Sequence, residues 1–135
     1  MRSVEYSTNY RVFGPNLDVA ALIAAFPPRA TYEVWRRGEV NVIGKKHVTS
    51  GVQIDLVDAR STTILNNSVV RFLRAERRFL RAVSKLRDPK VKSVLRTGIF
   101  VYAEQPATVH LRTDALALAA KNGVEWTITG YPCSD

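Results

Sequence analysis

The sequence predicts an α+β domain with a single mixed, mainly antiparallel sheet and helices packed on one face. Segments near both ends alternate apolar and polar residues, as half-buried strands do. A central segment instead repeats its apolar residues with a helical period. The expected order is β-α-β-β-α-β-β-α-β, and its first six elements follow the ferredoxin-like split β-α-β order. With 135 residues, 46% of them hydrophobic, the chain is expected to form a single domain over residues 1–135.

The first third of the chain contains two predicted strands and a short helix. Residues 4–12 alternate strictly and predict a strand with one buried face. Asn16 is expected to cap a short helix, which Pro27 and Pro28 should end because proline cannot continue a helix. Residues 31–35 form the second candidate strand.

The middle of the chain contains the least regular segment. Residues 38–50 fit either a loop or a poorly paired hairpin, because two glycines interrupt them. Residues 52–57 alternate again and predict a strand, and residues 58–67 are polar and rich in turn formers. A long helix is expected over residues 68–87, capped by Asn67 or Ser68.

The last third of the chain predicts a strand, a short strand, a helix and a final strand. Residues 94–103 read as a strand with Gly98 as a candidate bulge, and residues 107–111 as a short strand. Thr113 should cap a helix that ends near Gly123. Residues 124–129 form the last expected strand, and the residues after it are expected to form a tail.

A basic stripe on the long helix is the most informative feature of the sequence. Its cations are spaced three, four, three and four residues apart, which places them on one helical face. They extend roughly 21 Å along the axis at 1.5 Å per residue. The opposite face is apolar and is expected to be core. The stripe consists of Arg71, Arg74, Arg78, Arg81 and Lys85, and the apolar face of Val69, Phe72, Leu73, Phe79, Leu80, Val83 and Leu86.

The positive charge of the chain is concentrated on this helix. The net charge is +8, and residues 68–87 contain seven basic residues and one acid, so they account for six of these charges. An ordinary solvated helix face would mix glutamate with arginine at i, i+4, and this one does not. Arginine also favours forked contacts to phosphate or carboxylate. The stripe is therefore predicted to bind an anionic surface, with a merely solubilising face as the alternative.

A second basic region surrounds the irregular segment. If it folds beside the helix, the two regions would form one continuous patch, in which Trp35 offers a stacking surface. The alternative is that Trp35 is a core residue and the neighbouring arginines end a strand. The region comprises Trp35, Arg36, Arg37, Lys45, Lys46 and His47.

No catalytic or metal-binding motif is present in the sequence. The histidines are His47 and His110, the thiol is Cys133, and no two of them have metal-ligand spacing. No catalytic residue, metal ligand or cofactor is therefore expected. A lone cysteine cannot form an internal disulfide, which favours a reducing compartment. Because no apolar run resembles a signal peptide or membrane span, we expect a cytoplasmic protein without a membrane partner.

Four passages of the chain together carry a family resemblance. They are "YRVFG" at the end of the first strand, "ATYEVWRRGE", "SGVQIDL", and the closing "LALAAKNGVEWTITGY". This pattern resembles domain-of-unknown-function family 4279, a set of small bacterial proteins. The resemblance implies an α+β fold and a bacterial or phage origin. It implies no activity, cofactor or catalytic residue, and the arginine-rich helix is not part of the pattern.

Three functions are consistent with these observations. The leading hypothesis is a non-catalytic interaction protein, an immunity-type or phage anti-defence inhibitor, whose arginines contact an acidic protein partner. The second is a nucleic-acid-binding protein without sequence specificity, since the stripe contains no Asn or Gln to read base edges. The third is an enzyme or small-ligand domain with a site spread across the sheet, for which the sequence nominates no residue.

Overall fold

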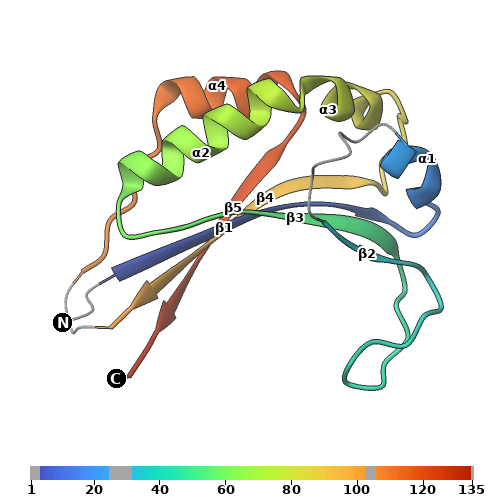
Figure 1. Cartoon of the computed structure of the whole chain (residues 1–135), viewed down its shortest axis with the longest axis horizontal. Helices are drawn as coiled ribbons and strands as arrows, with labels where there is room; N and C mark the ends of the chain where they lie inside the picture. The colour runs from blue at the N-terminus through green and yellow to red at the C-terminus, as the bar shows by residue number, and fades with distance from the viewer. Residues whose placement is uncertain (1–3, 25–31, 103–105, 135) are drawn as a thin grey trace.

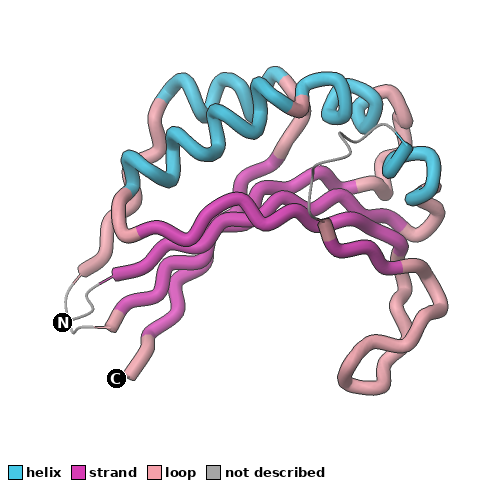
Figure 2. Tube along the Cα trace, in the orientation of Figure 1, coloured by secondary structure: helices cyan, strands magenta, loops and turns pink. Residues whose placement is uncertain are grey.

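The computed structural model describes residues 4–24, 32–102 and 106–134. It confirms the predicted fold class, because one mixed five-stranded sheet carries its four helices on the same face (Figures 1 and 2). In chain order the elements are β1 (Val4–Gly14), α1 (Val19–Ala24), β2 (Glu33–Trp35), β3 (Ser50–Ala59), α2 (Thr62–Ala75), α3 (Arg77–Ser84), β4 (Lys92–Val101), α4 (Thr113–Lys121) and β5 (Glu125–Pro132).

The strands lie in the order β2-β3-β1-β4-β5. The first four pair antiparallel with their neighbours, which is the arrangement of a split β-α-β fold. Helix α4 then returns the chain so that β5 adds parallel to β4. The ferredoxin-like order expected from the sequence is therefore present, with β5 as an additional edge strand.

The core lies between the helices and one face of the sheet. Tyr10 is at its centre, with its ring 5.0 Å from that of Phe72 and 6.2 Å from that of Phe79. Burial raises the pKa of the Tyr10 phenol, and its hydroxyl shares a 2.7 Å hydrogen bond with Ser93 Oγ. All predicted core residues of the central segment are buried except Leu86, which is 46% exposed after the helix has ended.

The predicted long helix is two helices, and it begins earlier than expected. Ser61, rather than Asn67 or Ser68, is the N-cap, and its Oγ accepts from the backbone N–H groups of Thr63 and Ile64. The hydroxyl satisfies donors that would otherwise be unpaired, so the polar segment starts a helix instead of a turn. The helical geometry breaks at Glu76, which ends α2 and precedes α3.

Other element predictions also need correction. Residues 107–111 form no strand. The bulge expected at Gly98 is absent from that position, since Gly98 pairs regularly with Ser7, and the register shift of the sheet falls between Thr8 and Asn9 instead.

The helix caps and the end of the chain also differ from expectation. Asp18, not Asn16, caps α1, since its carboxylate accepts from the Ala21 N–H. Arg112 rather than Thr113 precedes α4. The expected tail begins inside β5, which runs to Pro132. The helix-ending role of Pro27 and Pro28 lies outside the described residues.

Candidate functional site

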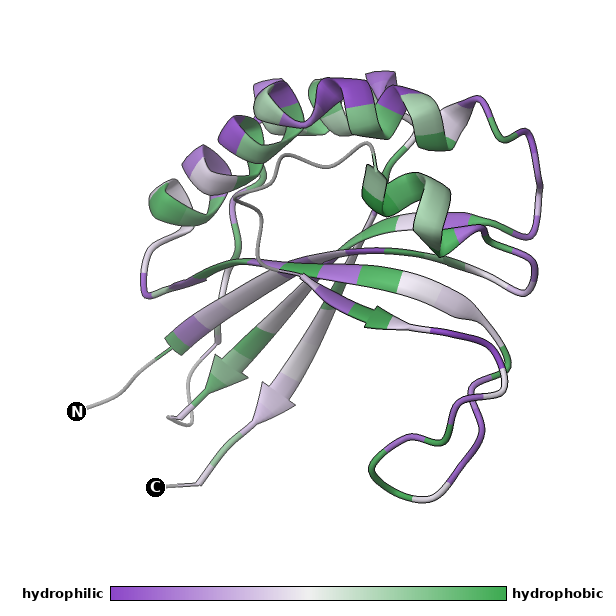
Figure 3. Ribbon diagram, turned by 45° about the vertical axis from the view of Figure 1, so that its right-hand side comes forward, coloured by the Kyte–Doolittle hydropathy of each residue, from purple (hydrophilic) through white to green (hydrophobic). Residues whose placement is uncertain are grey.

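The basic stripe forms an exposed face on the outer side of α2 and α3, which we call the helix face: Arg71, Arg74, Arg78, Arg81 and Lys85. All five side chains are exposed, while Phe72, Leu73, Phe79, Leu80 and Val83 on the inner side of the same helices are buried in the core. Figure 3 shows hydrophilic residues along the outward side of these helices and hydrophobic ones toward the sheet. The break at Glu76 falls between Arg74 and Arg78, so the cations are distributed over two short helices.

The helix face has little neutralising charge around it. None of its five cations forms an ion pair with a carboxylate of the described residues. Two acids lie close by: Glu76, at the break between the two helices, and Asp114 of α4, whose carboxylate binds Arg112 at 2.7 Å. Hydrogen bonds from Arg112, with a smaller contribution from Arg74, lower the pKa of Asp114. Asn67, Arg71, Arg74, Arg112 and Asp114 line a hollow between α2 and α4.

Asn66 anchors the side of this hollow. Its side chain is buried, and its Nδ2 donates to the carbonyls of Thr62 at 2.7 Å and His110 at 2.6 Å. Its Oδ1 accepts from the Arg112 N–H at 2.9 Å. These bonds hold residues 110–112, which lead into α4, against α2. Sequence reasoning assigned Asn67 and not Asn66 a structural role, because a long-range partner leaves no local pattern.

The second basic region does not join the helix face. Residues 36–49 form a projection between β2 and β3, which we call the finger. It extends from the end of the sheet to the side away from the helices (Figure 1). Arg36, Arg37, Lys45 and Lys46 are all exposed on it. The condition for one continuous patch is therefore not met, because the sheet separates the two regions.

The sequence allowed either a loop or a poorly paired hairpin in this segment. The finger is a narrow hairpin-like loop with one isolated bridge, between Val40 and Lys46. The Oδ1 atom of Asn41 accepts from the N–H groups of Ile43 and Lys45, each at 3.0 Å, and thereby closes the tip. Val42 is fully exposed and Ile43 is 71% exposed. Sequence reasoning weighed the cations here and missed the apolar tip, which "EVNVIGKK" does contain.

Trp35 is neither a core residue nor a free stacking surface. Its ring lies flat on Gly51, where an added Cβ would come within 2.2 Å of the ring. The guanidinium of Arg11 lies 4.6 Å from the same ring and 5.5 Å from the ring of Phe13. The Nε1 of Trp35 donates to Thr49 Oγ1 at 3.3 Å. Trp35 therefore holds the base of the finger on the sheet.

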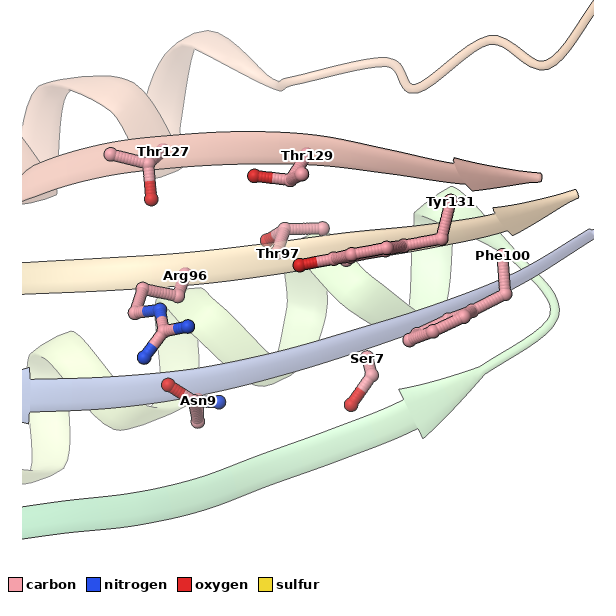
Figure 4. Close-up of a pocket in the computed structure, with 9 residues that line it drawn as sticks. Ser7, Asn9, Arg96, Thr97, Phe100, Thr127, Thr129 and Tyr131 are labelled. Carbon is pink, nitrogen blue, oxygen red and sulfur yellow. The ribbon is translucent and has the colours of Figure 1, made fainter. Parts of the chain in front are cut away.

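The helix-free side of the sheet, which we call the open face, contains a hollow that sequence reasoning missed. It has a volume of about 140 Å³ and collects side chains from β1, β4 and β5. Figure 4 shows Arg96, hydroxyl groups and two stacked aromatic rings around it. The polar positions of alternating strands identify the open face in sequence, but only the strand order brings these three strands together. The side chains around it include those of Ser7, Asn9, Arg96, Phe100, Thr127, Thr129 and Tyr131.

The described residues offer little for metal chemistry or membrane insertion. No group of three His, Cys, Asp or Glu residues in residues 4–24, 32–102 and 106–134 is placed to hold a metal ion. Among the same residues, no helix combines the length and the apolar composition that a bilayer crossing requires.

Comparison with known proteins adds no relative to this picture: no family model and no curated protein matches the chain. The candidate functional surfaces of the protein are therefore the helix face, the finger and the open face.

Proposed function

We propose that this protein is a non-catalytic interaction protein that binds and blocks a macromolecular partner, as an inhibitor of the immunity or anti-defence type. In this proposal the helix face contacts an acidic protein surface. The observation that carries it is the exposed row of four arginines and one lysine above a closed core, none of which forms an ion pair with a carboxylate in the part of the chain that the structure describes. Arginine suits such a surface because its planar fork binds carboxylates with two parallel hydrogen bonds.

The construction of the helix face supports a role in recognition. Its cations stand on helices whose inner sides are held by core residues such as Phe72 and Phe79, so their backbone positions are fixed before binding. A preorganised surface loses less conformational entropy when a partner binds. Complementary charge also accelerates association with an acidic partner.

The decisive experiment compares two triple charge reversals. One changes Arg74, Arg78 and Arg81 to glutamate on the helix face. The control changes Arg36, Arg37 and Lys45 to glutamate on the finger and alters the net charge equally. Each protein is used to capture partners from nuclease-treated lysate at low salt. We expect one stoichiometric protein with wild type and the finger variant, and its loss with the helix variant. Retention by a folded helix variant contradicts the proposal.

Nucleic-acid binding is the alternative that the same preparation tests. The ratio of absorbance at 260 and 280 nm is read before and after nuclease treatment. If nucleic acid co-purifies with the protein and a salt wash removes it, the partner of the helix face is nucleic acid and not an acidic protein. Five phosphate contacts would then give a slope of log affinity against log salt of about −4.5 on duplex DNA.

A further inference from the structure

The hollow on the open face collects hydrogen-bonding side chains from three strands, of which the Thr127 hydroxyl also donates to the Leu95 carbonyl at 3.5 Å. Ser7 comes from the central strand β1, Arg96 from β4, and Thr127 and Thr129 from the edge strand β5. Figure 4 shows the hydroxyl of Tyr131 pointing into the same space. A volume of about 140 Å³ accommodates several water molecules, and so also a small polyatomic anion.

Two cations occupy the middle of the open face without a direct counter-charge. The ladder neighbours of Arg11 are Gln53 and Val94, and those of Arg96 are Asn9 and Thr127, so no acid stands opposite either arginine. Glu33, Asp55 and Glu125, at adjoining positions of this face, form no ion pair with them. Two further acids stand at the far end of the hollow, where Asp58 pairs with Ser7 and Glu5 pairs with Phe100 in the ladders.

Arg11 and Arg96 carry like charges and lie close enough to repel each other. Burial and the nearby Arg96 lower the pKa of Arg11, and Glu33 only partly opposes them. Nε of Arg11 and Oδ1 of Asn9 are buried without a hydrogen-bond partner in the protein. An anion beside Arg96 would relieve the repulsion between the two guanidinium groups.

A flat aromatic wall borders Arg96 on the other side. The rings of Phe100 and Tyr131 stack with centroids 5.1 Å apart and an angle of 15°. They lie over Gly98, where an added Cβ would be 3.1 Å from Phe100 Cε2 and 3.3 Å from Tyr131 Cε2. Gly98 thus lets the rings lie against the sheet, and Tyr131 remains 43% exposed.

We propose that the hollow is a binding site for a phosphoryl group carried by a flat ring, a phosphomonoester of an aromatic compound. Arg96 supplies the positive charge, and the hydroxyls of Ser7, Thr129 and Tyr131 donate to the phosphoryl oxygens. Donors from three strands surround the space, which suits a tetrahedral oxyanion better than a planar carboxylate. The ring of the ligand lies against Tyr131. This site is on the opposite side of the sheet from the helix face and is independent of its function.

Amide NMR titrations with inorganic phosphate, phenyl phosphate and phenol test the proposal. We expect saturable shifts confined to the hollow, at the N–H groups of Gly98 and Thr129 and at Nε–H of Arg96. Phenyl phosphate should bind about tenfold more tightly than inorganic phosphate, because ring stacking adds to the ionic contact. Phenol alone should give no saturable shift.

Three variants separate a built site from general charge attraction. Arg96→Gln should weaken phenyl phosphate binding at least about tenfold, since it removes charge-assisted hydrogen bonds. Lys90→Gln removes the same charge from an exposed turn and should leave the affinity unchanged. Tyr131→Ala should reduce the affinity for phenyl phosphate to that for inorganic phosphate.

Three results would overturn the proposal. The first is the absence of saturable shifts at millimolar concentrations of either phosphate compound. The second is equal weakening by Arg96→Gln and Lys90→Gln, which would indicate only nonspecific attraction to a basic protein. The third is equal affinity for the two phosphate compounds in the wild type, which would refute the role of the aromatic wall. None of these results bears on the helix face, because none of the variants alters it.

Discussion

The helix face and the finger both present clustered cations, but only the helix face has a core beneath it. Behind Arg71, Arg74 and Arg78 stand fully enclosed side chains of α2 and α3. Behind Lys45 and Lys46 stand only a few backbone hydrogen bonds and the side chain of Asn41. The two sets of cations therefore stand on backbone of unequal rigidity, and the rigid backbone of the helices distinguishes a preformed surface from an adaptable one.

The helix face and the finger also differ in how many hydrophobic residues they expose. The helix face buries its hydrophobic residues, whereas the finger exposes Val40, Val42, Ile43 and Val48. Single exposed apolar residues are ordinary on protein surfaces, but four on one short loop are not. Charge alone thus describes the helix face, while the finger combines charge with an apolar tip.

The largest expected effect comes from detaching α4 from the helix face. Asn66→Ala removes three hydrogen bonds and leaves the carbonyl of His110 and the N–H of Arg112 without a protein partner. We expect a loss of about 2–4 kcal/mol in the free energy of unfolding, measured by urea denaturation. Asn67→Ala is the control, because Asn67 bonds Arg112 only at the surface, and it should change stability little. Equal losses in both variants would refute this role of Asn66.

The next effect is on the base of the finger. In Gly51→Ala the new Cβ would lie 2.2 Å from the Trp35 ring, so the ring and β2 must shift. We expect a loss of about 1–3 kcal/mol in urea denaturation, as for other overpacked sites. Gly130→Ala in β5 is the matched strand glycine, since nothing lies within 4 Å of its added Cβ. A Gly51→Ala protein as stable as the Gly130→Ala protein would argue against this anchor.

A smaller effect is expected at the finger tip. Asn41→Ala removes the acceptor for the N–H groups of Ile43 and Lys45. Global stability should change by less than about 0.5 kcal/mol, as is usual for surface substitutions. Hydrogen exchange at these two amides should accelerate, because the acceptor that they share is lost. Asn41→Asp retains an acceptor oxygen and should keep the protection; unaltered exchange in Asn41→Ala would contradict the assignment.

The smallest effect concerns pH and the acid beside the helix face. Arg112 lowers the pKa of the Asp114 carboxyl below its ordinary value of 3.8. A lowered folded-state pKa contributes stability that is present above the unfolded value and is lost as pH falls through the folded one. NMR titration of Asp114 should show the lowered pKa, and Arg112→Met should return it toward 3.8. An unchanged titration in that variant would exclude Arg112 as the cause.

The sequence predicted the parts of this molecule that local periodicity encodes. Alternation identified β1 and β3, and the spacing of Phe72, Leu73, Phe79 and Leu80 identified the buried side of α2 and α3. The local pattern gave a wrong prediction at two places. The polar residues that start α2 were predicted to form a turn, and no feature of the sequence at Glu76 predicted the break between α2 and α3. Capping by Ser61 decided the first case.

The candidate surfaces were predictable only in part, for a physical reason. The helix face lies on one stretch of chain, so its exposure followed from helical spacing. The placement of the finger depends on Trp35 resting on Gly51, and the hollow depends on β5 pairing with β4. Both are contacts between distant segments, and one sequence gives no register for them. The family resemblance and the cytoplasmic location remain predictions.

The central position of β1 has a consequence for how the chain folds during synthesis. β1 precedes every other strand in the sequence, yet its two partners are β3 and β4. As the chain leaves the ribosome, β1 must wait for about 45 further residues before β3 can pair with it, and for about 90 before β4 completes its other edge. An alternating strand in that position exposes its tyrosines and valines throughout the delay. We therefore expect the pairing of β1 with β3 to be the step that first covers these side chains in the nascent chain.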